Sequence, residues 1–515
     1  MARLAGLLLF VLLSACSQGP AVVTDNGTRL VGLTDEATGV AAFLGVPYAK
    51  APVGALRWAA PQALPQGDAR IDATQFAPAC MQDMRILDWY RDLAEAFGAP
   101  RTAYEDLQVA EDCLYLNIWT PAPAGGEDLP VMVYVHGGSN NSGWSYEPPY
   151  RGQHLAAEGA VVVTIAYRLG VFGFFSHPEL TGEAVANFGL WDQLAALRWI
   201  QENIHHFGGD PERVLLFGES AGAEDILALL YSDAADGLVA RAALQSPAGF
   251  GIDQASLAEE RHRGATLTAA LGLDGDNTLP HLRDLPAADL LAAYNEVFSD
   301  YYHSPVIDGE LLRRSTWDAV HSAEQMDVPL IVGTNADEWL EWVEENPEHS
   351  DLALRAAQLR HIDPSLALDV LAEENSLREA LERLSTAEEM LCPAQHVAAN
   401  VSRQGGKAWA YYFTRVRDGE AGARLGAFHG AEYTYIFATN YAGMPATPVD
   451  QGLQKAMQAY WLEFARKGDP NAGKLPAWPE FSAPTYAVQE LGDAVQSIAR
   501  PESLLCASFD ASQEF

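Results

Sequence analysis

Short runs of β-branched and aromatic residues alternate with longer helical patterns along much of this chain. Three apolar runs are short enough to be buried strands: residues 130–135, 160–166 and 213–217. Between the last two runs, residues 189–203 repeat apolar side chains at helical spacing, on a face made of Leu190, Leu194, Leu197 and Ile200. A strand, a helix and a further strand in this order predict an α/β fold, a mostly parallel sheet with helices on both faces.

Later segments extend the same pattern. Residues 328–332 and 407–413 read as further strands of the sheet. Residues 253–300 and 345–390 are charged and helical in pattern, and we interpret them as insertions or lids over the sheet, not as independent domains. The stretch from Gln82 to Glu111 mixes aromatic and charged residues, and it is either a packed surface loop or one wall of an active-site gorge.

The first residues indicate export. A positive start is followed by an almost wholly apolar run from Leu4 to Leu13, which is too short to span a bilayer and fits a signal peptide. The run ends in Leu-Ser-Ala-Cys at Cys16, which resembles a bacterial lipobox. We therefore expect residues 1–15 to be removed and Cys16 to carry lipid, anchoring the protein to the cell envelope on the periplasmic side. The alternative is an ordinary signal peptide and free secretion, with Cys16 incidental.

Composition limits the class of protein. The chain has 515 residues, 49% of them hydrophobic, which is ample for a large core. Its net charge of -37 excludes a general nucleic-acid binder, because such proteins need a basic surface. The charge fits a soluble acidic surface better than steering of cationic substrates, although it is compatible with both. The sequence leaves the oligomeric state open, and we expect a membrane contact only through the N-terminal lipid.

Four cysteines remain when Cys16 is set aside: Cys80, Cys113, Cys392 and Cys506. An even number in an exported chain predicts two disulfides, and four cysteines allow three pairings. None of them has the spacing of a metal site, so we predict no bound metal.

The strongest local motif is Gly218-Glu219-Ser220-Ala221-Gly222, directly after a predicted strand and before an apolar helical run. A nucleophilic serine needs a sharp turn from strand to helix, and small residues two positions before and after it relieve the crowding. The following helix directs its first amides toward charge that develops on a substrate oxygen. Ser220 is therefore the expected nucleophile.

Ser220 needs a base, and the base needs an acid that fixes its tautomer. The chain order for this arrangement is Ser, then Asp or Glu, then His. Asp337 and Glu338 follow a predicted strand, and His429 lies in a later loop beside a glycine. The order and the strand-end positions single out His429 among 13 histidines. Upstream, His136-Gly137-Gly138 follows another strand and matches an oxyanion loop.

These motifs together resemble the type B carboxylesterases, the family that includes the cholinesterases. The resemblance runs from about Gly39 to Cys506, nearly the whole mature chain. It is carried by the motifs above and by several further segments: Phe43 to Ala49, Pro52 to Trp58, Glu111 to Asn117, Pro305 to Gly309, Cys392-Pro393, Trp461 to Ala465 and Gly468 to Asn471.

The resemblance implies an α/β-hydrolase fold in one large domain over residues 16–515, after a short N-terminal linker, with no cofactor and a small-molecule ester as substrate. It assigns Glu338, not Asp337, as the acid of the triad. It places the oxyanion donors at Gly138, Ser139 and Ala221. It also implies two disulfide pairs: Cys80 with Cys113 and Cys392 with Cys506.

Two departures from the family pattern concern the substrate pocket, which we expect to include Asn140, Glu219 and Trp339. Ser139 replaces the third oxyanion glycine, and Asn140 replaces the aromatic residue that usually follows. Trp339 stands where a glycine commonly follows the acid. If Asn140 faces the pocket, its amide favours short or polar acyl groups; if it turns to solvent, it selects nothing. Trp89 does not match the choline-binding tryptophan of cholinesterases, so we predict no choline esterase.

The sequence therefore predicts a serine hydrolase that cleaves carboxylic esters through an acyl-enzyme. Some bacterial members of the family remove carboxylated acyl arms from natural products such as fumonisin, a substrate class that the strong negative charge opposes. Two alternatives remain. A catalytically dead adhesion protein would lack the serine, which this chain keeps, whereas activity on amides, thioesters or lactones would use the same residues.

Overall fold

The computed structural model describes residues 19–247, 254–273, 275–299, 302–322, 326, 328–372, 376–471 and 473–513. The expected signal peptide and Cys16 lie outside these residues. Within them, no helix is both long enough and apolar enough to cross a membrane.

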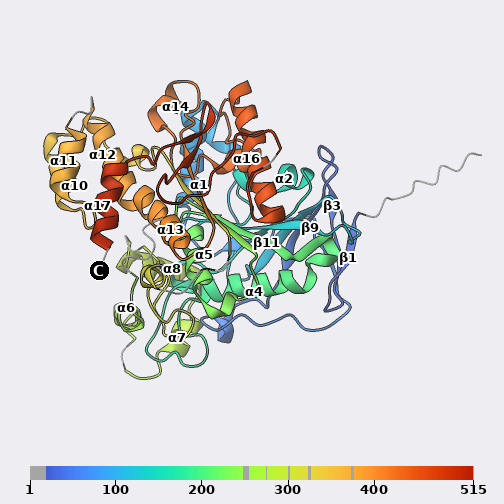
Figure 1. The fold of residues 1–515 in the computed structure, drawn as a ribbon. Helices are drawn as coiled ribbons and strands as arrows, with labels where there is room; N and C mark the ends of the chain where they lie inside the picture. The colour runs from blue at the N-terminus through green and yellow to red at the C-terminus, as the bar shows by residue number, and fades with distance from the viewer. Residues whose placement is uncertain are drawn as a thin grey trace, which may run out of the picture.

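The described residues contain a large twisted sheet at the centre of the molecule (Figure 1). Its strand order is β16-β15-β14-β13-β12-β11-β9-β10-β8-β4-β3. The strands are β3 (Leu33–Thr34), β4 (Ala41–Pro47), β8 (Tyr115–Thr120), β9 (Leu129–Val135), β10 (Val161–Ile165), β11 (Gly209–Glu219), β12 (Arg241–Gln245), β13 (Leu330–Asn335), β14 (Ala408–Phe413), β15 (Val488–Leu491) and β16 (Val495–Ile498). The pairs from β10 through β15 are parallel, and the outer pairs are antiparallel.

Side chains of β9 alternate between two hydrophobic cores, one on each face of the sheet. Val131 and Val133 join the core that contains Leu194 of α4 (Phe188–Asn203), whereas Met132 and Tyr134 join the core that contains Trp461 of α16 (Pro448–Lys467). A strand buried on both faces has no polar face, which is why the sequence showed a continuous apolar run. The predicted α/β architecture with helices on both faces is confirmed.

The stretch from Gln82 to Glu111 contains helix α1 (Arg85–Ala96), so reading the whole stretch as a loop was wrong. Leu87, Tyr90 and Leu93 recur at helical spacing and are buried, while charged residues between them face outward. In the sequence, the helical spacing of these three residues was obscured by the other aromatic residues next to them.

The two charged, helical segments are built as expected. The first contains α6 (Leu257–Ala270), α7 (Leu279–Asp284) and α8 (Ala287–Val297), and the second contains α10 (His349–Ala357), α11 (Pro364–Leu371) and α12 (Leu377–Thr386). In Figure 1 the second group lies beside the C-terminal helix α17 (Ser503–Gln513). Both groups pack on one core through Leu267, Leu290 and Leu384, as insertions over the sheet would.

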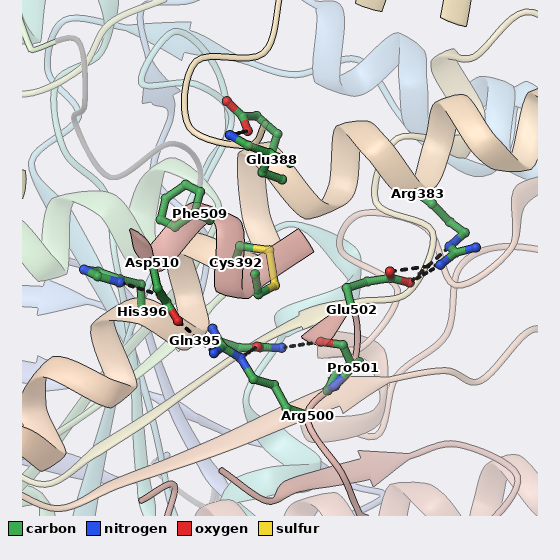
Figure 2. Close-up of a disulfide and its surroundings, with 12 residues drawn as sticks. Arg383, Glu388, Cys392, Gln395, His396, Arg500, Pro501, Glu502, Phe509 and Asp510 are labelled. Atoms are coloured by element: carbon green, nitrogen blue, oxygen red, sulfur yellow. Dashed lines mark hydrogen bonds and ion pairs between the residues drawn. A yellow bond between two sulfur atoms is a disulfide. The ribbon is translucent and has the colours of Figure 1, made fainter. Parts of the chain in front are cut away.

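Two disulfides join Cys80 to Cys113 and Cys392 to Cys506, the pairs that the resemblance implied. The second bond ties α17 to α13 (Cys392–Arg403), as Figure 2 shows. Polar contacts surround it: His396 Nδ1 lies 2.7 Å from Asp510 Oδ1, and Arg500 donates to Asp510 Oδ2 at 2.8 Å. The C-terminal helix is therefore held by a covalent bond, an ion pair and a hydrogen bond.

Candidate active site

Ser220 lies at the sharp turn between β11 and α5 (Ala221–Leu230), with backbone angles of φ 56° and ψ −129°. A serine in this region carries backbone strain of about 1–3 kcal/mol, so the surrounding structure must hold it there. A Cβ on Gly218 would lie 2.6 Å from the carbonyl oxygen of Val135, and a Cβ on Gly222 would lie 2.4 Å from the same atom. The two glycines are therefore required by crowding, as the sequence predicted.

His429 and Glu338 come together as expected from their order in the chain. The Nδ1 atom of His429 donates to Glu338 Oε2 at 2.7 Å. The other carboxylate oxygen of Glu338, which is fully buried, accepts from the backbone N–H of Asn335 at 2.7 Å and from the Ser246 hydroxyl at 2.5 Å. This carboxylate fixes the proton of His429 on Nδ1, so that Nε2 is the atom that can act as a base.

Asp337 points away from the imidazole. Its Oδ2 atom accepts from the backbone N–H of Ala427 at 2.7 Å, and a Cβ on Gly426 would lie 2.5 Å from the same oxygen. Burial raises the pKa of Asp337. Asp337 therefore braces the loop that leads to His429, and the two adjacent carboxyl groups serve different partners.

Glu219 is a third carboxyl group at the site, and its contact with His429 was missed by the sequence reasoning. Its Oε1 atom lies 3.1 Å from His429 Nε2. Burial raises the pKa of Glu219, whereas the nearby His429 lowers it by a smaller amount. Burial alone would lower the pKa of His429, but Glu219 and then Glu338 outweigh burial and raise it. The two groups consequently compete for one proton.

The loop after β9 lies directly against Ser220. A Cβ on Gly137 would lie 2.8 Å from Ser220 Cβ and 2.9 Å from Glu219 Oε2. Backbone φ is 98° at Gly138 and 57° at Ser139, so Ser139 adopts the left-handed conformation that the family's glycine would take freely. Among the described residues, no backbone acceptor or side chain takes a hydrogen bond from the amides of Gly138, Ser139 or Ala221. Three unused amides beside a serine can bind a developing oxyanion.

Asn140 was expected either in the pocket or in solvent, and both expectations were wrong. Its side chain is fully buried. The amide nitrogen donates to Asp225 Oδ1 at 3.0 Å and to the His303 carbonyl at 2.9 Å, while Oδ1 accepts from the Tyr167 hydroxyl at 3.2 Å. Asn140 thus anchors the loop to α5 and to the segment around His303, and it adds no polarity to the pocket.

Aromatic side chains border the imidazole. The half-buried Trp339 stacks on the His429 ring, with centroids 6.0 Å apart and planes inclined by 10°. Trp89 of α1 packs edge-on against Phe428 and donates its Nε1 proton to Glu341 at 3.0 Å. Helix α1 therefore stands beside the loop that carries His429, which favours the gorge-wall interpretation of its segment.

Comparison with known proteins gives consistent matches. The model of the carboxylesterase family matches residues 18–504. A fumonisin B1 esterase of Sphingopyxis macrogoltabida is 34% identical over 459 residues, covering 86% of this chain and 82% of the relative. A human cocaine esterase is also 34% identical, over 90% of this chain and 86% of the relative.

Solved structures agree. A PNB esterase superposes with a TM-score of 0.81 at 29% identity, over 95% of this chain and 99% of the other. A carboxylesterase of Geobacillus stearothermophilus also gives a TM-score of 0.81, at 31% identity, over 95% of this chain and all of the other. The fold is accordingly that of the α/β-hydrolases, as the resemblance implied.

Proposed function

The chain belongs to the carboxylesterase family and is a carboxylic ester hydrolase, and we propose that Ser220, His429 and Glu338 perform the hydrolysis through an acyl-enzyme. The observation that carries this proposal is the 2.7 Å hydrogen bond from His429 to the buried Glu338, beside the strained turn at Ser220. The bond fixes the tautomer that a serine nucleophile requires of its base.

The steps follow from these positions. The Ser220 oxygen attacks the ester carbonyl, and its proton passes to His429 Nε2. The amides of Gly138, Ser139 and Ala221 bind the oxyanion of the tetrahedral intermediate. Collapse of that intermediate breaks the bond to the alcohol, which takes the proton from Nε2. A water molecule then repeats the sequence on the acyl-enzyme and releases the acid.

Glu219 affects how readily His429 Nε2 takes up the proton from Ser220. One oxygen of its carboxyl group contacts the imidazole, and the other borders the same point beside Gly137 as the Ser220 side chain. We infer that Glu219 stabilises the imidazolium formed during attack. Because of this contact, His429 can act as a base only after the proton shared with Glu219 has left both groups or is held by Glu219.

We propose that Trp339 determines the acyl preference, because the Asn140 side chain is buried in the interior and does not line the pocket. The indole covers one side of the imidazole and fills space beside the acid, which favours short acyl groups. We infer that the carboxyl groups of Glu219 and Glu341, which both interact with His429, oppose carboxylated arms of the fumonisin type. We propose a preference for short, uncharged acyl groups, with carboxylated natural-product esters as the second candidate because of the similarity to a fumonisin B1 esterase.

The nucleophile is tested with Ser220→Ala and a matched control, Ser232→Ala, whose hydroxyl caps a distant turn. The first variant should lose turnover of p-nitrophenyl acetate by several orders of magnitude and should no longer react with a fluorophosphonate. The control should keep both. Full activity in Ser220→Ala would refute the assignment, and an inactive wild type would favour an adhesion protein.

The substrate preference is tested with acetate, butyrate, octanoate and hemisuccinate esters of one alcohol, in the wild type and in Trp339→Gly. The wild type should have its highest specificity constant for acetate or butyrate, and the variant should gain most on octanoate. A wild type fastest on hemisuccinate would select the second candidate.

Two disulfides fit an exported protein. We propose that Cys16 carries the lipid anchor on the periplasmic side of the envelope. A fatty-acid probe should label the wild type and not Cys16→Ala, and an unlabelled wild type would leave only an ordinary signal peptide.

A further inference from the structure

Three side chains of metal-binding type meet on the surface, outside the site around Ser220. They are Asp25, His205 and His206, and their ligand atoms lie within 4.8 Å of one another. Asp25 lies in the turn between β1 (Ala21–Val23) and β2 (Arg29–Val31), whereas both histidines belong to the 3-10 helix η4 (Ile204–Phe207). His206 Nε2 lies 2.7 Å from Asp25 Oδ1, and the two imidazole centroids are 3.8 Å apart.

The backbone beneath these side chains is held in place. Asn203, just before η4, is buried, donates to the Trp199 carbonyl at 2.8 Å and accepts from the backbone N–H of Asp25 at 2.9 Å. At the other end, the carbonyl of the buried Phe207 accepts from the Thr120 hydroxyl at 2.7 Å. The relative position of the two segments is thus set without a metal, while the exposed or half-buried ligand side chains remain able to rotate.

The donor set points to a class of cation. Two imidazoles and one carboxylate suit zinc, cobalt, nickel or copper, whereas calcium and magnesium prefer oxygen ligands alone. Metal–ligand bonds of about 2.0–2.1 Å separate tetrahedral ligands by about 3.3 Å. The 2.7 Å contact must therefore open by about 0.6 Å, and the wider contacts must close; rotation of the exposed Asp25 and His205 side chains and of the half-buried His206 provides both changes.

Space for a further ligand is present. A hollow of about 780 Å³ is bordered by residues 21–25, residues 123–126 and both histidines. It is open to solvent, so a water molecule can complete a coordination shell that the protein supplies with three ligands. Such a site would cross-link the β1–β2 hairpin, which pairs with β5 (Arg70–Asp72) in a small sheet of its own, to the body of the enzyme.

We propose that Asp25, His205 and His206 form a structural site for a divalent transition metal of the zinc class, which clamps the N-terminal hairpin onto η4. This site is independent of ester hydrolysis. Asp25 is separated from the two adjacent histidines by about 180 residues, so no local spacing in the sequence could indicate the site.

The test uses purified mature protein stripped of metal and titrated with zinc chloride. The wild type should bind about one zinc ion per chain, and its unfolding temperature should rise with zinc concentration. Cobalt(II) should give a visible spectrum typical of low-coordinate nitrogen and oxygen ligation. The variant His205→Gln/His206→Gln should weaken zinc binding by on the order of tenfold or more, and so should Asp25→Asn.

The matched control is His281→Gln/His349→Gln, which removes two exposed histidines that belong to no such cluster among the described residues. It should bind zinc and respond in unfolding temperature as the wild type does. Esterase activity without metal should be equal in all of these proteins. Equal zinc affinity in the wild type and the His205→Gln/His206→Gln variant, or zinc binding without a rise in unfolding temperature, would overturn the proposal.

Discussion

Replacement of Glu338 by glutamine should remove most of the turnover while leaving the fold intact. The carboxylate accepts from Asn335 N–H and Ser246 on one oxygen and from His429 on the other. A glutamine side chain keeps only one acceptor oxygen. The backbone N–H of Asn335 cannot change from donor to acceptor, so the amide oxygen must face it and the amide nitrogen must face His429.

The imidazole then has to accept at Nδ1 and carry its proton on Nε2. That tautomer cannot take the proton of Ser220. An Asp-to-Asn change in other serine hydrolase triads has the same effect and lowers kcat by about 10⁴-fold. The loss corresponds to about 5.4 kcal/mol in the activation free energy. KM should change little, because Glu338 is buried and does not contact substrate.

Steady-state hydrolysis of p-nitrophenyl acetate measures kcat, and thermal unfolding confirms that the variant folds. Asp337→Asn is the matched control, since its amide oxygen can still accept from Ala427 and its side chain does not reach the imidazole. The control should keep kcat within a few-fold of the wild type. A folded Glu338→Gln that keeps a tenth of the wild-type kcat, or an Asp337→Asn that loses as much as Glu338→Gln, would refute the assignment.

Three other changes test neighbouring parts of the structure. Glu219→Gln removes a carboxylate that raises the pKa of His429; because only the neutral imidazole is a base, the acid limb of kcat/KM should move to lower pH, and an unmoved limb would contradict the coupling. Replacing Cys392 and Cys506 by alanine should lower the free energy of unfolding by about 5 kcal/mol, from the loop entropy of a 114-residue separation, as denaturant titration would measure. Asn140→Ala should cost about 3 kcal/mol through lost buried hydrogen bonds, yet the ratio of acetate to octanoate specificity constants should stay as in the wild type.

Five strands of the sheet, β9, β10, β11, β13 and β14, and the turn at Ser220 could be predicted because their signals are local. A continuous apolar run marks a strand buried on both faces, and the two glycines around Ser220 mark a turn in which any side chain would collide with the carbonyl of Val135. The order of Ser220, Glu338 and His429 added a long-range constraint that residue spacing alone does not supply.

Contacts between distant segments could not be predicted from local patterns. Asn140 reads as a polar residue beside an oxyanion loop, and only the positions of Asp225 and Tyr167 show that its hydrogen bonds are satisfied in the interior. The contact of Glu219 with His429 had a usable signal, since Glu219 immediately precedes Ser220 at the strand end. Nothing in the sequence, however, shows which way its side chain turns.

The arrangement of the disulfides has a consequence for maturation. Each bond joins a cysteine to the next one along the described chain, Cys80 to Cys113 and Cys392 to Cys506. When a chain crosses a membrane with its amino end first, Cys80 is still an unpaired thiol when Cys113 emerges. Cys392 is likewise still unpaired when Cys506 emerges. A thiol oxidant that simply joins each new cysteine to the one waiting therefore makes the native pairs. Production in a foreign host should require an oxidising compartment and should not depend on an enzyme that reshuffles wrong bonds.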